Sequence, residues 1–273
     1  MQPLSLTNVI AHRGANRFAP ENTVPAFRLA KQQGASWVEF DVQLSRDNIP
    51  VIIHDETLER TTNGHGLVRD FTFAQLRALM VQQYGITTHI PSLAETLNLL
   101  TTVGLHANIE IKSVCTPNAA LDLLTDEPLD LMRNRNNAAL TCNELKHYLK
   151  GVMPTQAGIH RTKSQFLISS FCMAALHRAR QVLPNIPIGM LLYFKNWEHE
   201  WPRKKIAIQQ HFKRLDAYSL HINQEVLTVE RACELQKICP RILTYTVNDV
   251  ARSRQLFSFD IHSIFTDNVL IFE

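Results

Sequence analysis

Cysteine is scarce in this sequence and follows no recognisable pattern. The chain of 273 residues has five cysteines, which lie far apart, at Cys115, Cys142, Cys172, Cys233 and Cys239. An odd number of cysteines without a Cys-x-x-Cys pair argues against a disulfide framework and against a zinc–thiolate site. We therefore expect a protein of a reducing compartment, the cytoplasm.

Long apolar runs are also missing. No stretch approaches the roughly 20 apolar residues that a membrane-spanning helix needs. The first residues, from Met1 to Asn8, have neither a basic start nor a long apolar core. We therefore expect no membrane span and no cleaved signal peptide. Hydrophobic residues still make up 45% of the chain, which is enough for the core of a soluble, enzyme-sized domain.

The sequence has little excess of either charge. Its formal net charge is +3, and its clearest basic run, Arg203-Lys204-Lys205, is typical of a solvated helix face. A nucleic-acid-binding domain usually carries a much stronger basic excess. We therefore expect no nucleic-acid partner.

Strand-like and helix-like segments alternate along most of the chain, which is the signature of a parallel α/β sheet. About eight strong strands are expected, and a closed barrel of this class typically has roughly 250 residues. We predict a (β/α)8 TIM barrel in one domain, residues 1–273, with a crossover and an insertion around residues 113–164. The expected strands begin at Val9 and cover residues 37–44, 50–54, 106–112, 166–171, 186–192, 217–222, 241–247 and 263–265. The expected helices cover residues 24–34, 72–81, 92–100, 173–182, 204–214, 228–238 and 250–257.

Acidic side chains occupy alternate positions of the second strand. Glu39 and Asp41 lie on one face of it, and apolar residues lie on the other, because successive side chains of a strand point to opposite faces. The strand at residues 106–112 repeats the design with Glu110 and Lys112. A single carboxylate is most often held in a salt bridge, but three on inward faces need a shared positive charge. Carboxylate oxygens favour Mg²⁺ or Ca²⁺, so we predict a hard-metal site.

Two histidines and two cations are expected at the same rim of the barrel. His12 and His54 end hydrophobic strands, and a pair of imidazoles at one rim can act as acid and base near neutral pH. Arg13 and Lys112 add positive charge beside the metal, which indicates an anionic substrate. This combination is suited to phosphoester cleavage.

Short motifs spread nearly from end to end of the chain resemble those of one enzyme family, the glycerophosphodiester phosphodiesterases, especially the short cytosolic bacterial type. The motifs are His12-Arg13-Gly14, Pro20-Glu21-Asn22-Thr23, Glu39-Phe40-Asp41-Val42, His54-Asp55, Leu58-Glu59-Arg60-Thr61-Thr62-Asn63-Gly64, Ile90-Pro91-Ser92-Leu93, Asn108-Ile109-Glu110-Ile111-Lys112, Ser169-Ser170-Phe171, Tyr245-Thr246-Val247-Asn248 and Thr266-Asp267.

The resemblance implies a TIM barrel, a divalent cation (Mg²⁺ or Ca²⁺) and hydrolysis of glycerophosphodiesters, such as glycerophosphocholine or glycerophosphoethanolamine, to glycerol 3-phosphate and an alcohol. It also implies a role for each matching residue. These are His12 and His54 as acid and base, Glu39, Asp41 and Glu110 as metal ligands, Arg13 and Lys112 as phosphate-binding residues, Phe171 and Tyr245 as pocket-lining residues, and Asn22 and Asn248 as supports of the rim.

Other interpretations remain open at this point. A glycosidase would use paired carboxylates without a metal, a binding module would hold a phosphodiester without cleaving it, and a lipid-directed phospholipase would be the closest alternative in chemistry. The sequence leaves open the head-group preference, the choice between Mg²⁺ and Ca²⁺, the assignment of acid and base to the two histidines, and the nucleophile, which is either water or a glycerol hydroxyl that forms a cyclic phosphate. It also leaves open the role of residues 113–164 and the oligomeric state.

Overall fold

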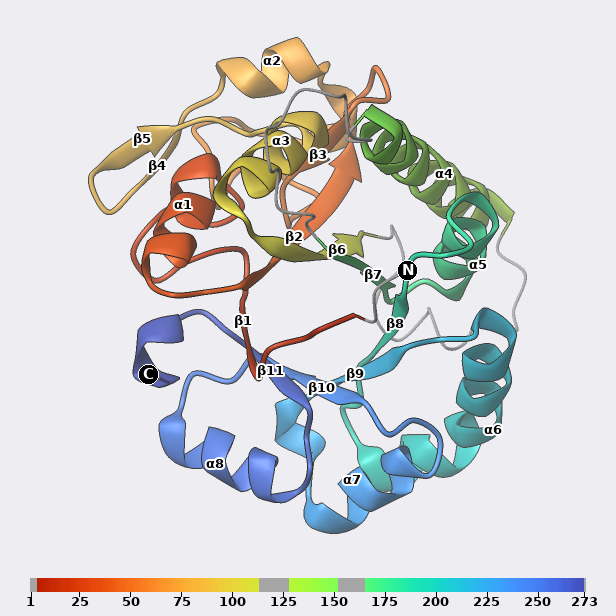
Figure 1. Ribbon diagram of the computed structural model, residues 1–273. Helices are drawn as coiled ribbons and strands as arrows, with labels where there is room; N and C mark the ends of the chain where they lie inside the picture. Colours follow the sequence, from red (N-terminus) through yellow and green to blue (C-terminus); the bar gives the residue numbers. More distant parts are fainter. Residues whose placement is uncertain (1–3, 113–127, 152–164, 273) are drawn as a thin grey trace.

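The computed structural model describes residues 4–112, 128–151 and 165–272 of the chain. Within these residues, eight parallel strands form a closed barrel, which confirms the predicted TIM-barrel fold (Figure 1). The ring closes because β1 pairs with both β2 and the last strand, β11, at Ala11 opposite Val38 and Thr266. The barrel strands are β1 (Val9–Ala11), β2 (Trp37–Leu44), β6 (His106–Ile111), β7 (Phe166–Ser170), β8 (Ile188–Leu192), β9 (Ser219–Asn223), β10 (Ile242–Tyr245) and β11 (Ser263–Thr266).

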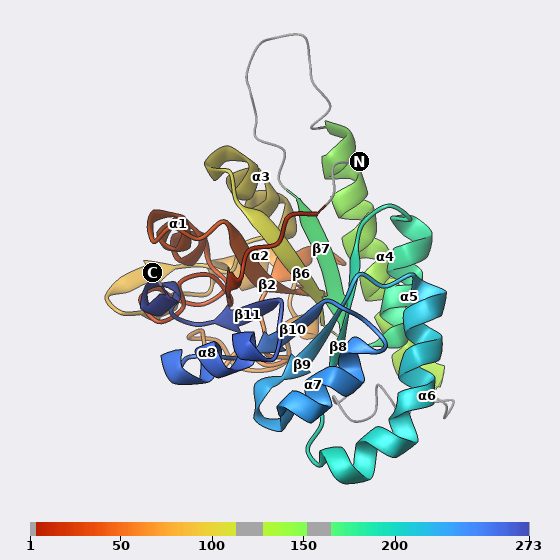
Figure 2. The same cartoon turned by 60° about the horizontal axis from the view of Figure 1, so that its bottom comes forward.

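Helices surround the barrel, and α4, α5 and α6 lie along one side of it in both views (Figures 1 and 2). Several helices begin directly after a residue whose side chain caps them. Thr23 caps α1, and Ser92 forms a capping box with Glu95 at the start of α3. The helices are α1 (Val24–Gln32), α2 (Phe73–Ala78), α3 (Leu93–Val103), α4 (Pro128–Gly151), α5 (Met173–Val182), α6 (Trp197–Leu215), α7 (Val229–Gln236) and α8 (Val250–Ser258), with short 3₁₀ helices at η1 (Val68–Asp70), η2 (Gln224–Val226) and η3 (Val269–Phe272).

The strand expected at residues 50–54 does not join the ring. It forms β3 (Pro50–Ile52), which runs antiparallel to the end of β2. The chain reverses at Asn48, whose φ of 62° lies in the left-handed region that favours a tight turn. A strand that returns directly after such a turn can pair only antiparallel, since a parallel pair needs a long crossover. His54 therefore lies in the loop after β3 and not at the end of a barrel strand.

The helix expected at residues 72–81 is also too long. It ends at Ala78, and Val81 begins a two-stranded hairpin of β4 (Val81–Gln83) and β5 (Ile86–Thr88), which the sequence analysis missed. Tyr84 and Gly85 form its turn, and both have positive φ, as the common two-residue hairpin turns require.

One helix fills the described part of the region from 113 to 164. Within this region the residue pattern predicts two helical stretches, around residues 119–133 and 142–149, whereas α4 is continuous from Pro128 to Gly151. Ala138, Cys142 and Leu145 are buried in the main core, and Tyr148 donates a hydrogen bond of 2.7 Å to the Leu97 carbonyl of α3. Thus α4 is the crossover between β6 and β7. The rest of the predicted insertion lies outside the described residues.

The core has two layers, separated by the strands. Outward-facing residues such as Val38 and Phe40 pack under the helices. Inward-facing residues fill the barrel itself and make a second cluster of Ile10, Trp37, Leu167, Leu243 and Phe265. Leu4 and Leu6 pack against this inner cluster, and the Trp37 indole donates a hydrogen bond of 2.9 Å to the Ser5 carbonyl. One end of the barrel interior is therefore apolar and covered, which leaves the other end for polar groups.

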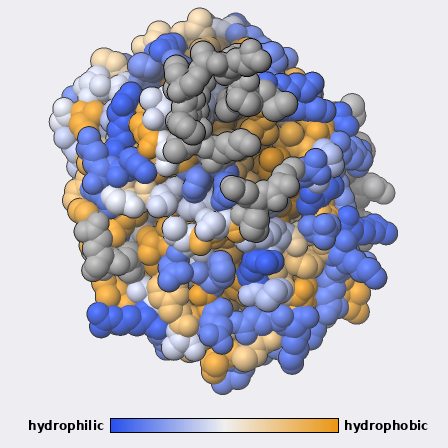
Figure 3. All heavy atoms as spheres, viewed as in Figure 1, coloured by the Kyte–Doolittle hydropathy of each residue, from blue (hydrophilic) through white to orange (hydrophobic). Residues whose placement is uncertain are grey.

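The molecular surface carries the expected charge pattern. Hydrophilic side chains lie along the outer edge over α5 and α6 (Figure 3). In the basic run of α6, Lys204 pairs with Glu200 at 2.5 Å and Lys205 with Glu234 at 2.7 Å, so acidic neighbours balance much of its charge. Among the described residues, no helix is both long and apolar enough to cross a membrane.

Candidate active site

Neighbouring strands β2 and β6 bring three carboxylates together at the polar end of the barrel. Their register places Asp41 directly opposite Glu110. Glu39 lies two residues before Asp41 on the same inward face of β2, and both are almost fully buried. One oxygen atom from each of the three carboxylates lies within 4.8 Å of the others. The sequence-predicted metal ligands are therefore close together in space.

The electrostatics of this cluster show that it carries more negative charge than its neighbours neutralise. Burial, reinforced by Asp41 and Glu110, raises the pKa of Glu39 well above its ordinary value. Burial would also raise the pKa of Asp41, but the positive charges of Lys112 and Arg13 outweigh it and lower that pKa. One oxygen of Glu39, Oε1, is buried without a hydrogen-bond partner. An acceptor buried in this way costs free energy unless a cation or a proton binds it.

A divalent cation fits this donor set. Oxygens that share one Mg²⁺ or Ca²⁺ lie about 2.0–2.6 Å from it, and so at most about 5 Å from one another. The three carboxylate oxygens meet that limit. All three donors are hard oxygen ligands, as these cations prefer, and among the described residues no cysteine or histidine belongs to the cluster.

His12 follows β1 and is held by a carboxylate from the other end of the chain. Its Nδ1 lies 2.7 Å from Oδ1 of Asp267, which follows β11, and its Nε2 lies 3.9 Å from Oε2 of Glu39. Asn16 and Asn248 also donate hydrogen bonds to the Asp267 carboxylate. Burial alone would raise the pKa of Asp267, but these hydrogen bonds and His12 lower it. Asp267 is therefore an anion that orients the imidazole of His12.

The turn after His12 depends on Gly14. Its φ is +81°, a conformation that L side chains rarely adopt, and an added Cβ would lie 2.8 Å from the Ala26 side chain. Arg13 itself has a φ of 54° and donates its backbone N–H to Glu39. This tight turn allows the backbone to pass between helix α1 and the carboxylate cluster, with His12 facing the cluster.

His54 also has a carboxylate on its Nδ1. The distance to Oδ1 of Asp55 is 2.6 Å, and Arg60 donates to the same carboxylate and to Glu21. Burial would raise the pKa of Asp55, but the hydrogen bonds from Arg60 and His54 lower it to about 2. Burial, together with the charges of Lys112 and other cations, lowers the pKa of His54 itself. Asp41 and Asp55 oppose this shift without reversing it, so the neutral form of the His54 imidazole is favoured.

The loop that carries His54 is tied to β2 by one side chain. Gln43 lies two residues beyond Asp41 on the same face of the strand, and its Nε2 lies 3.1, 3.0 and 2.6 Å from the carbonyl oxygens of Ile53, His54 and Asp55, respectively. This contact places His54 beside the cluster although β3 does not belong to the barrel.

Two cations border the cluster. Lys112 Nζ lies 3.0 Å from Glu110 Oε1 and 3.4 Å from Asp41 Oδ1. Arg13 Nε lies 3.4 Å from Asp41 Oδ2, and Arg13 Nη1 donates to Glu21 at 2.9 Å. Asn22 donates to Asp41 at 2.8 Å. Both predicted phosphate-binding residues thus adjoin the predicted metal ligands.

The predicted pocket residues form an aromatic pair at the same end of the barrel. The rings of Phe171 and Tyr245 meet edge to face with their centroids 6.1 Å apart. The Tyr245 hydroxyl donates a hydrogen bond of 2.8 Å to the Leu192 carbonyl at the end of β8. This bond fixes the ring across the ends of three strands.

Sequence reasoning assigned no role to the residues that orient the two histidines. Asp55, Arg60 and Asp267 were visible only as members of motifs, and Gln43 lies outside the motifs. Two signals were available. Asp55 directly follows a predicted site histidine, and Gln43 continues the i, i+2 series of Glu39 and Asp41. No local signal pointed to the pairing of His12 with Asp267, which are 255 positions apart.

The family profile, the related sequences and the related structures all indicate the same enzyme family. The profile of the glycerophosphoryl diester phosphodiesterase family matches residues 12–271. A glycerophosphodiester phosphodiesterase of Caldanaerobacter subterraneus subsp. tengcongensis is 31% identical over 96% of this chain and 94% of its own length. One of Bacillus subtilis is 29% identical over 94% of this chain and 82% of its own length. The structure of a phosphodiesterase of Oleispira antarctica in complex with the product sn-glycerol-3-phosphate is similar with a TM-score of 0.74, at 30% identity over 96% of this chain and 93% of that chain.

Proposed function

Because the chain belongs to the glycerophosphoryl diester phosphodiesterase family, it is a phosphoric diester hydrolase that acts on glycerophosphodiesters, and we propose which of its residues perform the reaction. Glu39, Asp41 and Glu110 hold a divalent cation. His12 and His54 transfer the protons. The products are glycerol 3-phosphate and an alcohol.

One observation supports this assignment above all others. Both imidazoles use Nδ1 to contact a carboxylate, and both lie beside the three-carboxylate cluster. His12 Nε2 is 3.9 Å from Glu39, and the charge of Asp41 acts on His54. An Nδ1–H that is bound to a carboxylate leaves Nε2 free to accept or donate a proton.

The residues divide the reaction between them. Arg13 and Lys112 bind and orient the anionic phosphodiester. The lowered pKa of His54 favours its neutral form, which can accept a proton, so we assign to His54 the removal of the proton of the attacking hydroxyl, which belongs to water or to the glycerol. His12 protonates the departing alcohol. If the glycerol hydroxyl attacks, the product of this step is a cyclic phosphate, which water must then open to give glycerol 3-phosphate. A divalent cation bound by the carboxylates would stabilise negative charge on the phosphate oxygens and lower the pKa of a bound hydroxyl.

Substitution of either histidine tests this assignment. His12→Ala and His54→Ala should each lower kcat for glycerophosphocholine or glycerophosphoethanolamine about 10²- to 10⁴-fold, because each removes a proton carrier. The rate is followed by phosphorus NMR with Mg²⁺, with Ca²⁺ and with a chelator. His65→Ala, at an exposed loop histidine, is the matched control and should leave kcat unchanged. Near-normal turnover by a folded His12 or His54 variant would refute the assignment, and full activity in chelator would remove the cation from it.

The remaining features follow from the same proposal. We propose Mg²⁺ or Ca²⁺ as the cation, because the donor set consists of carboxylates. The substrate is a small molecule. We further propose that residues 1–273 form a single catalytic domain that works in the cytoplasm, the compartment for which the unpatterned cysteines argue.

A further inference from the structure

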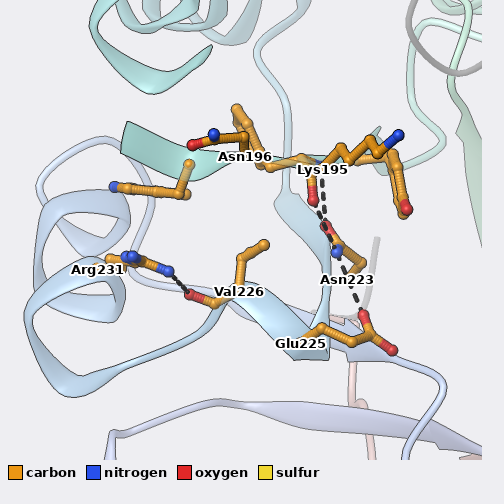
Figure 4. A pocket seen from close by; sticks show the side chains of 9 residues that line it. Lys195, Asn196, Asn223, Glu225, Val226 and Arg231 are labelled. Atoms are coloured by element: carbon orange, nitrogen blue, oxygen red, sulfur yellow. Dashed lines mark hydrogen bonds between the residues drawn. The ribbon is translucent and has the colours of Figure 1, made fainter. Parts of the chain in front are cut away.

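Residues after β8 and β9 line a hollow of about 540 Å³ (Figure 4). It lies between the loop after β8 and the loop after β9, and its lining includes Tyr193, Lys195, Asn223, Glu225 and Arg231. Since all barrel strands are parallel, the loops after β8 and β9 lie at the same end of the barrel as the carboxylate cluster at the ends of β2 and β6. The hollow is therefore part of the catalytic face.

Tyr245 lies near both the lining of the hollow and the carboxylate cluster. Its hydroxyl is bound to the Leu192 carbonyl, directly before the loop that begins the hollow. Burial raises the pKa of this hydroxyl, and the negative charges of Glu110 and Glu225 raise it further. Tyr245 thus lies within electrostatic reach of one carboxylate of the cluster and of the carboxylate that lines the hollow.

The charged side chains that line the hollow are not equally available to bind a ligand. Arg231 donates to Glu198 at 2.7 Å and to the Val226 carbonyl at 2.8 Å, and its guanidinium lies over the Trp197 ring. Lys195 extends into solvent, and no hydrogen bond of its side chain is present among the described residues. The charge of Arg231 is therefore already paired within the lining of the hollow, whereas the charge of Lys195 is solvated.

Glu225 differs from both cations because it is held in place and yet has no positive partner. Asn223 Nδ2 donates to its Oε2 at 3.2 Å, and Gln224 Nε2 donates to its Oε1 at 3.3 Å. Within the described part of the chain, no Lys, Arg or His forms an ion pair with it. Asn223 is itself fixed by two hydrogen bonds to the Phe194 backbone (Figure 4). A fixed carboxylate with a free negative charge is suited to bind a cationic group.

We propose that this hollow receives the alcohol part of the substrate and that Glu225 favours alcohols that carry an ammonium group, such as ethanolamine or choline. The inference rests on the proposed function, because it places the reacting phosphate at the carboxylate cluster and lets the alcohol extend past Tyr245. The ammonium group then lies beside Glu225, and the aromatic ring of Tyr193 adds a favourable surface for a quaternary ammonium.

A comparison of substrates with and without an ammonium group tests the inference. In Glu225→Gln, kcat/KM for glycerophosphocholine and glycerophosphoethanolamine should fall about threefold to fivefold, as expected for the loss of one solvent-accessible ion pair. The kcat/KM for glycerophosphoglycerol, whose alcohol is uncharged, should stay unchanged. Glu225→Lys should enlarge the difference because it replaces attraction by repulsion. Glu230→Gln, at an exposed carboxylate of α7, is the matched control and should affect none of the substrates.

The results separate this inference from the proposed function. If the unmodified protein hydrolyses none of the three diesters, the proposed function fails. If it hydrolyses them and Glu225→Gln changes all three equally or not at all, the head-group inference fails while the proposed function stands. Selective loss that also shrinks as the salt concentration rises supports an ion pair between Glu225 and the head group.

Discussion

At the scale of single residues, the site depends on the carboxylate that contacts Nδ1 of each imidazole. His12 and His54 contact Asp267 and Asp55, and both carboxylates have lowered pKa values because further donors bind them. A carboxylate that is already an anion fixes the ring and stabilises the imidazolium that forms during proton transfer. Asp55 and Asp267 therefore belong to the site although they touch neither the cation nor the phosphate in the proposed mechanism.

A third histidine is buried inside the barrel without such support. His221 is fully buried on β9, its Nε2 lies 2.9 Å from Ser219 Oγ, and its Nδ1 has no hydrogen-bond partner. Gly189 on β8 leaves the space for its ring, since a Cβ there would lie 2.4 Å from Nε2. Burial lowers the pKa of His221 to about 3, so it stays neutral in the folded protein.

This residue should make the folding stability depend on pH. The unfolded chain binds a proton at His221 below its ordinary pKa of about 6.5, whereas the folded protein does not until about pH 3. Stability is therefore full above pH 6.5 and falls as the pH drops towards 3, by at most about 1.4 kcal/mol per pH unit from this group. In His221→Gln, the free energy of unfolding, measured by urea titration between pH 7 and 4.5, should fall less steeply than in the unmodified protein. Parallel pH profiles would contradict the prediction.

At the scale of secondary-structure elements, β2 organises the site. Its inward face carries Trp37 in the apolar interior, then Glu39 and Asp41 in the cluster, and finally Gln43, which holds the loop of His54. A strand displays every second residue on one face. One element therefore supplies, in order, a residue packed in the apolar interior, two proposed metal ligands and the residue that holds the His54 loop. This order explains how β3 can lie outside the ring without displacing His54.

Gln43 gives a prediction at this scale. Gln43→Ala removes the donor shared by three carbonyl groups and should let the His54 loop shift, which should lower kcat about tenfold to a hundredfold, because small displacements of a catalytic group are costly. Cation binding should change little, since the three carboxylates remain. Steady-state kinetics and metal titration measure the two effects. Gln82→Ala, on the exposed part of the β4–β5 hairpin, is the control. An unchanged kcat would show that Gln43 does not position His54.

At the scale of the whole molecule, barrel closure is what assembles the site. The pairing of β1 with β11 brings His12 next to Asp267, and the pairing of β2 with β6 brings Asp41 next to Glu110. The cluster exists only in the folded chain, so a cation that binds it must stabilise the fold. The surplus negative charge around Glu39 is a folding cost that the same cation would relieve.

Added cation should therefore raise the melting temperature. At a concentration of Mg²⁺ or Ca²⁺ about 100 times the dissociation constant, stability should rise by about 2.7 kcal/mol, or about 5–10 °C for a chain of this size. Scanning calorimetry with and without a chelator measures the shift. Asp41→Asn should abolish it, whereas Asp260→Asn, in a loop before β11 at the other end of the barrel, should leave it intact. A shift that survives Asp41→Asn would place the cation elsewhere.

The sequence by itself determined most of the architecture and the chemistry of the proposed site. The alternation of strands and helices predicted the barrel. The i, i+2 acids of β2, together with Glu110 of β6, predicted a cluster, because both signals are local and periodic. The helices expected from residues 24 and 92 begin at Val24 and Leu93, since the start of a helix is signalled by a few neighbouring residues.

Only the tertiary structure decided which partners these residues meet. Four features depend on how segments are placed in space. They are the contact of His12 with Asp267, the contact of Tyr245 with β8, the antiparallel course of β3, and the position of Glu225, which has no ion-pair partner among the described residues, in the lining of a hollow. Such contacts leave no periodic trace in the sequence, because each follows from ring closure and side-chain packing in three dimensions and not from the preferences of neighbouring residues.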